Sequence, residues 1–232
     1  MFLARRTLQA EYFDAPDLSA AEAREHYAWL GRINRLTQFD RPFRRWLPET
    51  VGVENCANLE VLDLGAGDGS LGRTLRDWAS QKGWSWRFTD LDLSPHTRPL
   101  NTSGRHVVGS VTALPFPDES FDAVIATTMT HHLKSEADVV AHFREAVRVA
   151  RRGVLLCDLH RNSLFAAGLW GVLVALGAPG EFRRDGVLSV RRGWRVPEWR
   201  RLADTAGLTS ARVWSEHGTR VLLQFKKSRG SA

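Results

Sequence analysis

Cysteine, lysine and long apolar runs are scarce in this chain of 232 residues. Neither Cys56 nor Cys157 lies in a spacing typical of a metal site or a disulfide framework, which indicates a reducing cytoplasm. The first residues, MFLARRTLQAEYFD, lack the longer apolar core of a signal peptide, which also predicts a cytoplasmic protein. The apolar residues 164–178 are too few and too rich in glycine for a transmembrane helix.

Lysine supplies only four of the 32 basic residues, and arginine supplies the other 28. Such an imbalance is as typical of a GC-rich genome as of a binding surface, so the net charge of +6 does not by itself indicate a nucleic-acid partner. The positive excess lies in residues 141–200, which hold eleven arginines and five acidic residues.

Low-complexity tracts, internal repeats and long polar linkers are also missing, so we expect the chain to fold nearly throughout. Its length suits one domain with a lid, because two halves of this size would each be marginal. Ser19 and Glu22 form a helix start, and the apolar residues that follow at helical spacing predict one or two amphipathic helices ending near Pro48. We therefore expect a helical lid at 1–50, and a main domain at 51–232 with a substrate-covering insertion at about 162–196.

Beyond the lid, short alternating segments are separated by helical stretches. The pattern predicts helices at 69–81 and 135–150 and strands at 59–64, 85–91, 105–109, 121–127 and 153–158. This alternation builds a parallel sheet covered on both faces. A helix from Pro197 to about Ala206 and two extended runs that meet at His217 and Gly218 predict a final antiparallel hairpin. We expect an α/β fold with a mainly parallel seven-stranded sheet.

Three glycines, Gly65, Gly67 and Gly69, follow the first predicted strand. Glycine accepts the backbone angles of a sharp turn and lets a ligand approach the main chain, although such a turn also occurs in pyrophosphate-binding proteins or without any ligand. Asp92 lies about twenty residues further on, at the end of the next strand, where an acid accepts hydrogen bonds from a ribose. The pair predicts a nucleoside site.

Four segments in order, VLDLGAGDGSLG, TDLDLSP, ALPFPDESFDAVIATTMTHHL and GVLLCDLHRN, resemble the motifs of class I S-adenosylmethionine-dependent methyltransferases. The likeness covers about residues 59–160. Residues 162–208 also resemble, less specifically, a bacterial subgroup of small-molecule enzymes of methyltransferase types 11 and 12. The likeness over residues 59–160 implies a Rossmann-like fold and the cofactor S-adenosyl-L-methionine, with S-adenosyl-L-homocysteine as product. It places the cofactor against Asp63, Gly65, Ala66, Gly67, Gly69, Asp92, Leu93, Ser110, Val111, Thr127 and Thr128.

One motif departs from the family pattern. Relatives commonly carry an aspartate before the ALPF run, which contacts the adenine amino group, whereas this chain has Ser110 there. Because a hydroxyl is a weaker acceptor than a carboxylate, the departure predicts lower cofactor affinity unless another residue compensates.

Methyl transfer needs an aligned nucleophile and a group that takes its proton. The candidates follow the fourth and fifth strands: His131, His132, Asp158 and His160 for catalysis. Helix capping or core packing explains each histidine equally well, and His160 and Arg161 could instead pair with acids of the lid. No third ligand stands at a metal-binding spacing from the histidine pair, so we expect no metal.

The acceptor is expected to be a small hydrophobic or aromatic molecule, held by Met129, Arg161, Trp170, Arg191 and Arg192. The segment after the fourth strand, ATTMTH, lacks the Asn/Asp-Pro-Pro-aromatic run of enzymes that methylate exocyclic amines of nucleic acids, which disfavours that reaction. Methylation at a hydroxyl or ring position of RNA stays open, but the sequence shows no RNA-binding module, so no nucleic-acid partner is expected. The leading hypothesis is O-methylation of a phenolic or polyketide-like compound of secondary metabolism. The alternatives are C-methylation of a quinone-like ring, a non-catalytic nucleoside-binding scaffold and an NAD-binding protein. Residues 164–178 suit either a lid helix or transient contact with a membrane surface, and the chain either a monomer or a homodimer.

Overall fold

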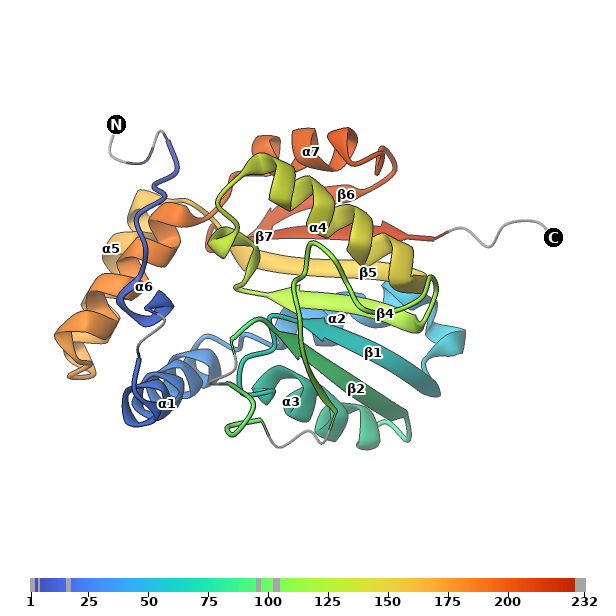
Figure 1. The fold of residues 1–232 in the computed structure, drawn as a ribbon, viewed down its shortest axis with the longest axis horizontal. Coiled ribbons are helices and arrows are strands. Elements are labelled where there is room, and N and C mark those ends of the chain that lie inside the picture. The colour runs from blue at the N-terminus through green and yellow to red at the C-terminus, as the bar shows by residue number, and fades with distance from the viewer. Residues whose placement is uncertain (1–2, 4, 16–17, 95–96, 102–104, 228–232) are drawn as a thin grey trace.

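A computed structural model describes residues 3, 5–15, 18–94, 97–101 and 105–227. Seven strands form one sheet in the order β3-β2-β1-β4-β5-β7-β6 (Figure 1). Their bounds are β1 Asn58–Leu64, β2 Ser85–Asp92, β3 His106–Val108, β4 Phe121–Thr127, β5 Ala150–Leu159, β6 Arg212–Glu216 and β7 Arg220–Lys226. The first five strands run parallel, while β7 pairs antiparallel with both β5 and β6. The predicted α/β fold with its final antiparallel hairpin is confirmed.

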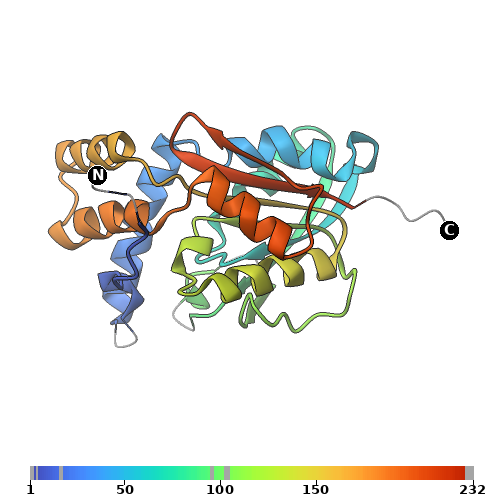
Figure 2. The same cartoon turned by 90° about the horizontal axis from the view of Figure 1, so that it is seen from above.

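Helices cover both faces of the sheet (Figure 2). On one face, α2 (Arg41–Val51) and α3 (Ser70–Ser80) share an apolar core with β1, β2 and β4. On the other, α4 (Glu136–Val149) and α7 (Val196–Thr205) pack on the opposite side chains of the same strands. Because both faces are buried, the parallel strands carry almost continuous apolar residues.

The second helix runs past the proline at which the sequence predicted its end. Pro48 lies inside α2, which continues to Val51, and Gly52 with φ +84° follows it. A proline within a helix removes a hydrogen bond, but Phe43, Leu47 and Val51 of this helix are buried against the sheet. Burial of this apolar face outweighs the local cost. Although α2 falls within residues 1–50, it packs on the sheet rather than with the outer helices.

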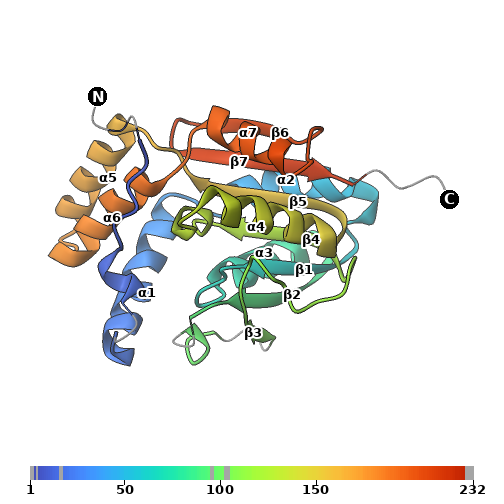
Figure 3. The same cartoon turned by 45° about the horizontal axis from the view of Figure 1, so that its top comes forward.

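Three further helices lie beyond the carboxyl ends of the parallel strands (Figure 3). They are α1 (Ala20–Leu36), α5 (Ser163–Ala175) and α6 (Gly180–Arg192). A small separate apolar cluster joins them through Ile33, Leu173 and Phe182. No helix in the described ranges is long and apolar enough to cross a bilayer.

A buried histidine in α4 predicts a loss of stability in mild acid. Burial lowers the pKa of His142 from 6.5 to about 4. His142 therefore binds a proton below about pH 6.5 in the unfolded chain but only below about pH 4 in the folded chain. As the pH falls from about 6.5 to about 4, the free energy of unfolding decreases. From this group alone we expect a loss of about 2 kcal/mol between pH 7 and pH 5.

Urea denaturation of the wild type and of His142→Phe at both pH values measures this loss. Phenylalanine keeps the ring shape without the titrating group, so the variant should lose about 2 kcal/mol less than the wild type on acidification. Equal losses in the two proteins would show that His142 does not resist protonation.

Candidate active site

The glycine turn between β1 and α3 has no room for side chains. Gly65, Gly67 and Gly69 all have positive φ, at +67°, +56° and +73°. A Cβ atom added at Gly65 would lie 2.1 Å from the side chain of Met129, and one at Gly67 would lie 2.8 Å from the ring of Tyr27. The turn is anchored from β2, because the amides of Gly65 and Ala66 donate to the carbonyl of Leu91 at 2.7 and 3.1 Å.

The acid predicted to hold a ribose stands directly beside this turn. Asp92 ends β2, and its Oδ2 accepts the amide of Gly67 at 2.9 Å. Its Oδ1 accepts the amide of Ser94 at 2.9 Å, which fixes the carboxylate between the two loops. The neighbouring Leu93 is 70% exposed. The structure thus brings together the two features that the sequence linked only by spacing.

The carboxyl group of Asp63, at the end of β1 before the turn, lacks a compensating positive charge in the described part of the chain. Asp63 is buried, and neither of its oxygens has a hydrogen-bond partner among the described residues. Burial, and then the charges of Asp90, Asp92 and Asp68, raise the pKa of Asp63 well above its usual value. A positively charged ligand at this end of β1 would relieve the cost of the buried acid. The ammonium and sulfonium groups of S-adenosylmethionine are such charges, so the residues present fit this cofactor.

The remaining predicted cofactor residues follow β3 and β4 along the same edge of the sheet. The hydroxyl of Ser110 lies 2.8 Å from that of Thr112, and Val111 is buried. Thr127 is the last residue of β4, and Thr128 after it has φ +48° with its amide bonded to the carbonyl of Cys157 at 3.0 Å. These positions border the strands that carry Asp63 and Asp92.

A buried histidine–aspartate pair stands next to the glycine turn. His131 lies in a 3-10 helix, η4 (Thr130–His132), two residues after the Met129 that contacts Gly65. Its Nδ1 lies 2.7 Å from Oδ1 of Asp158, and its amide donates to Oδ2 at 2.7 Å. Burial opposes ionisation of Asp158, but the charge and hydrogen bond of His131 and the amides of Leu159 and His131 outweigh it and lower the pKa. An ionised Asp158 only accepts, so the ring proton of neutral His131 sits on Nδ1.

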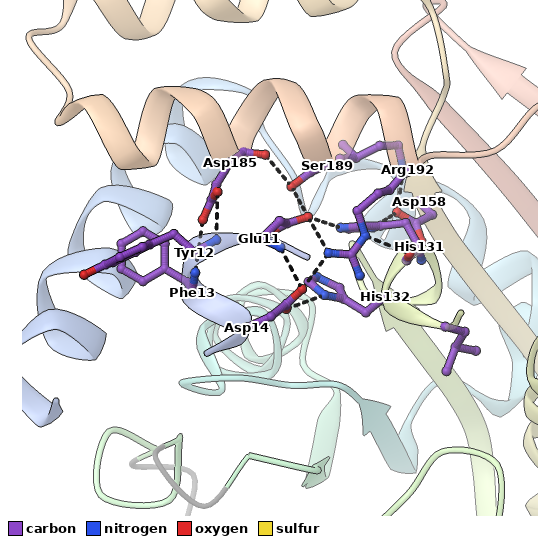
Figure 4. A network of polar contacts seen from close by, with 12 residues as sticks. Glu11, Tyr12, Phe13, Asp14, His131, His132, Asp158, Asp185, Ser189 and Arg192 are labelled. Atoms are coloured by element: carbon purple, nitrogen blue, oxygen red, sulfur yellow. Dashed lines mark hydrogen bonds and ion pairs between the residues drawn. The ribbon is translucent and has the colours of Figure 1, made fainter. Parts of the chain in front are cut away.

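The other ring nitrogen of His131 faces the N-terminal strap, which we define as residues 5–14 (Figure 4). Its Nε2 lies 3.8 Å from Oε1 of Glu11. Arg192 of α6 donates to the same Glu11 oxygen at 3.1 Å and to Asp14 at 2.6 Å, while His132 pairs with Asp14 at 2.9 Å. The strap therefore covers the histidine pair from the outside.

The strap is also fixed along α6 and over η4. Asp185 accepts the amides of Tyr12 and Phe13 at 3.0 and 3.1 Å. Arg6 donates to the carbonyl of Arg192 at 2.6 Å and to that of His131 at 3.0 Å. Sequence reasoning missed Glu11 and Asp14, because an irregular segment has no periodicity that would reveal which residues it approaches.

His160 and Arg161 have partners of other kinds. His160 is half-buried, and its Nδ1 lies 3.1 Å from the carbonyl of Gly218 in the turn between β6 and β7. Arg161 is buried, where it binds the carbonyls of Leu3 and Gly193 and pairs with Glu198 of α7. These contacts tie segments of the fold together rather than leaving the two side chains facing His131.

Two of the predicted acceptor residues meet in a hollow of about 540 Å³ against α6. Trp170 and Arg191 line it together with Glu11 and Tyr12 of the strap. Glu11 thereby connects the hollow to the polar network around His131. Met129 and Arg192 border His131 itself, so four of the five predicted acceptor residues divide between these two places, and Arg161 lies in neither.

Comparison with known proteins points to one family. Residues 62–157 match the sequence profile of a methyltransferase domain. A demethylmenaquinone methyltransferase of Roseiflexus sp. (strain RS-1) is 43% identical over 143 residues, with 55% of each chain covered. One of Tropheryma whipplei (strain Twist) is 30% identical over 149 residues, covering 59% of this chain and 56% of its own. The chain thus spans a little over half the length of the curated relatives it matches.

Solved structures agree in fold. Magnesium protoporphyrin IX methyltransferase from Synechocystis PCC 6803, with bound S-adenosylhomocysteine, superposes with a TM-score of 0.55 at 14% identity over 85% of each chain. A protein of Methanococcus maripaludis assigned to the S-adenosyl-L-methionine-dependent methyltransferases gives 0.58 at 17% identity, covering 97% of this chain and 100% of its own. The glycine turn and Asp92 thus lie in a segment that matches a methyltransferase domain, and the fold is that of S-adenosylmethionine-dependent methyltransferases of known structure.

Proposed function

We propose that the protein transfers a methyl group from S-adenosylmethionine to a small hydrophobic acceptor with an aromatic hydroxyl. The carrying observation is the His131–Asp158 pair, which is buried beside the glycine turn. A histidine held in one tautomer by a carboxylate presents its other ring nitrogen as a proton acceptor. The outer helices α1, α5 and α6 and the N-terminal strap form the proposed lid over the acceptor.

On the cofactor side, the chain contributes charge and shape. Asp63 would face the positive charge of the cofactor, and Asp92 would accept from the ribose hydroxyls. The part of the cofactor between them would lie along Gly65 and Gly67 once the side chains of Met129 and Tyr27 move aside. When bound, S-adenosylmethionine supplies an electrophilic methyl group. Tyr27 of α1 lies against Gly67 and helps to close this end of the site.

On the acceptor side, His131 would remove the hydroxyl proton. Asp158 keeps the ring proton on Nδ1, which leaves the lone pair of Nε2 to accept, and it stabilises the imidazolium that forms. Glu11, 3.8 Å from Nε2, lies where the acceptor hydroxyl would need to enter. The strap therefore has to shift locally when the acceptor binds, and its return would exclude water from the reacting groups.

The same deprotonation serves two outcomes. An aromatic oxyanion shares its charge between the oxygen and the ring carbons ortho and para to the carbon that bears it, so either the oxygen or one of these carbons can attack the methyl group. O-methylation is the outcome that the sequence favoured. The names of the similar curated proteins, demethylmenaquinone methyltransferases, support carbon methylation of a quinol-like ring as the second candidate.

Incubation with methyl-labelled S-adenosylmethionine and a panel of phenols, hydroquinones and hydroxy acids tests the proposal. We expect label in at least one hydroxy-aromatic compound, and mass spectrometry with carbon NMR then shows whether oxygen or carbon holds it. Label in hydroxy acids alone would overturn the aromatic acceptor. No transfer to any compound, despite tight cofactor binding, would favour the non-catalytic scaffold.

A further inference from the structure

Helix α5 is apolar on all sides yet lies at the surface. Residues 162–180 contain no charged side chain. Only Leu173 of the helix is fully buried, whereas its other large apolar residues stay in contact with solvent. The exposed fractions are 84% for Leu164, 53% for Trp170, 41% for Val172 and 38% for Val174, with 47% for Leu176 just after the helix. Contiguous exposed apolar surface of this kind marks an interaction site.

The helix occupies the outer edge of the molecule. Figures 1 and 2 show it beside α6 at one end of the molecule, beyond the end of the sheet. A flat surface could therefore reach α5 without touching the sheet.

Positive charge adjoins this apolar face. Arg183, Arg184 and Arg191 of α6 line the same hollow as Trp170. Three acids line it too, but two of them are already engaged: Glu11 with Arg192, and Asp185 with the strap amides. Amide hydrogen bonds leave the charge of Asp185 in place, so Asp185 and Glu181 stand against the three arginines. The excess is one positive charge, beside an amphipathic tryptophan.

We propose that α5 docks on the surface of a membrane containing anionic lipids. The exposed leucine and valine side chains would enter the boundary between headgroups and acyl chains, and the arginines would bind lipid phosphates. Tryptophan and arginine suit this boundary, because each joins an apolar body to a polar end. A second copy of the chain fits less well, since a two-fold contact through α5 brings the arginines of both copies together.

Membrane docking goes beyond the proposed reaction and does not depend on it. A sedimentation assay compares binding of the full chain to phosphatidylcholine vesicles and to vesicles in which about a third of the lipid is phosphatidylglycerol. We expect binding to the anionic vesicles, weakened by salt, and at least about tenfold weaker binding to phosphatidylcholine alone. Equal binding to both, or binding to neither, would overturn the proposal.

Variants assign the contact to its residues. Leu164→Glu should weaken binding to the anionic vesicles by at least about tenfold, and Leu164→Glu/Val174→Glu should weaken it further. The matched control is Val53→Glu, at a valine 64% exposed before β1, which should bind as the wild type does. Arg183→Gln/Arg184→Gln should reduce the preference for anionic lipid while leaving the apolar face intact.

Further measurements show whether the α5 variants stay folded and able to bind the cofactor product, and whether α5 mediates self-association. Thermal unfolding and S-adenosylhomocysteine affinity should match the wild type in every α5 variant, because the nearest neighbours of Gly65 and Gly67 and the hydrogen bonds of Asp92 come from other elements. Sedimentation equilibrium without lipid tests the competing occupant. The outcome that would assign α5 to self-association is a wild-type dimer that dissociates in the Leu164→Glu variant, while the variant binds vesicles as the wild type does.

Discussion

Replacing His131 with glutamine should lower turnover by about 10²–10⁴-fold and leave S-adenosylhomocysteine affinity nearly unchanged. Glutamine retains a side chain that can hydrogen-bond but cannot take up the acceptor proton. Asp158→Asn should also slow turnover strongly, because an amide does not stabilise the imidazolium and no longer fixes the ring tautomer. Steady-state turnover with the best labelled acceptor, paired with calorimetric cofactor titration, separates loss of chemistry from loss of binding.

The control for this prediction is His160→Gln. His160 was an equal candidate from the sequence, but it lies against the carbonyl of Gly218. We expect the variant to retain most of the turnover. If His160→Gln loses turnover and His131→Gln keeps it, the proton acceptor is His160. Retention by both variants would exclude a histidine base at either position.

Asp92→Ala is expected to raise the dissociation constant of S-adenosylhomocysteine by about 30–150-fold. A charged hydrogen-bond acceptor contributes about 2–3 kcal/mol, and this carboxylate would meet the ribose hydroxyls. The matched control, Asp77→Ala, removes an exposed carboxylate from α3 and should bind as the wild type does. Because Asp92 also accepts amides of Gly67 and Ser94, thermal unfolding must show that the variant is folded. Unchanged affinity in a folded Asp92→Ala protein would contradict the nucleoside site.

Local pattern was sufficient for most of the sheet. The strand predicted at 121–127 begins and ends as observed, and the helix predicted at 135–150 spans 136–149. Parallel strands buried on both faces leave apolar runs that differ clearly from the amphipathic helices between them. The glycine turn and Asp92 were found because the backbone angles and the strand end constrain residue type locally.

Contacts between segments that are distant in the chain could not be predicted from the sequence. The second helix, predicted to end near Pro48, continues three residues further to Val51, because local propensity carries no information on burial of Phe43 and Leu47 against the sheet. The pairing of His131 with Glu11 joins residues 120 positions apart, across an irregular segment. No spacing rule links such residues, so only the tertiary structure reveals that the strap covers His131.

One titration tests the central claim, that the turn at Gly65 to Gly69 together with Asp92 is a site for S-adenosylmethionine. S-adenosylhomocysteine and NAD are titrated separately into the wild-type protein in a calorimeter. We predict saturable one-to-one binding of S-adenosylhomocysteine and no measurable heat of binding with NAD. Tight binding of NAD alone would contradict the assignment of this pocket and, with it, the proposed reaction.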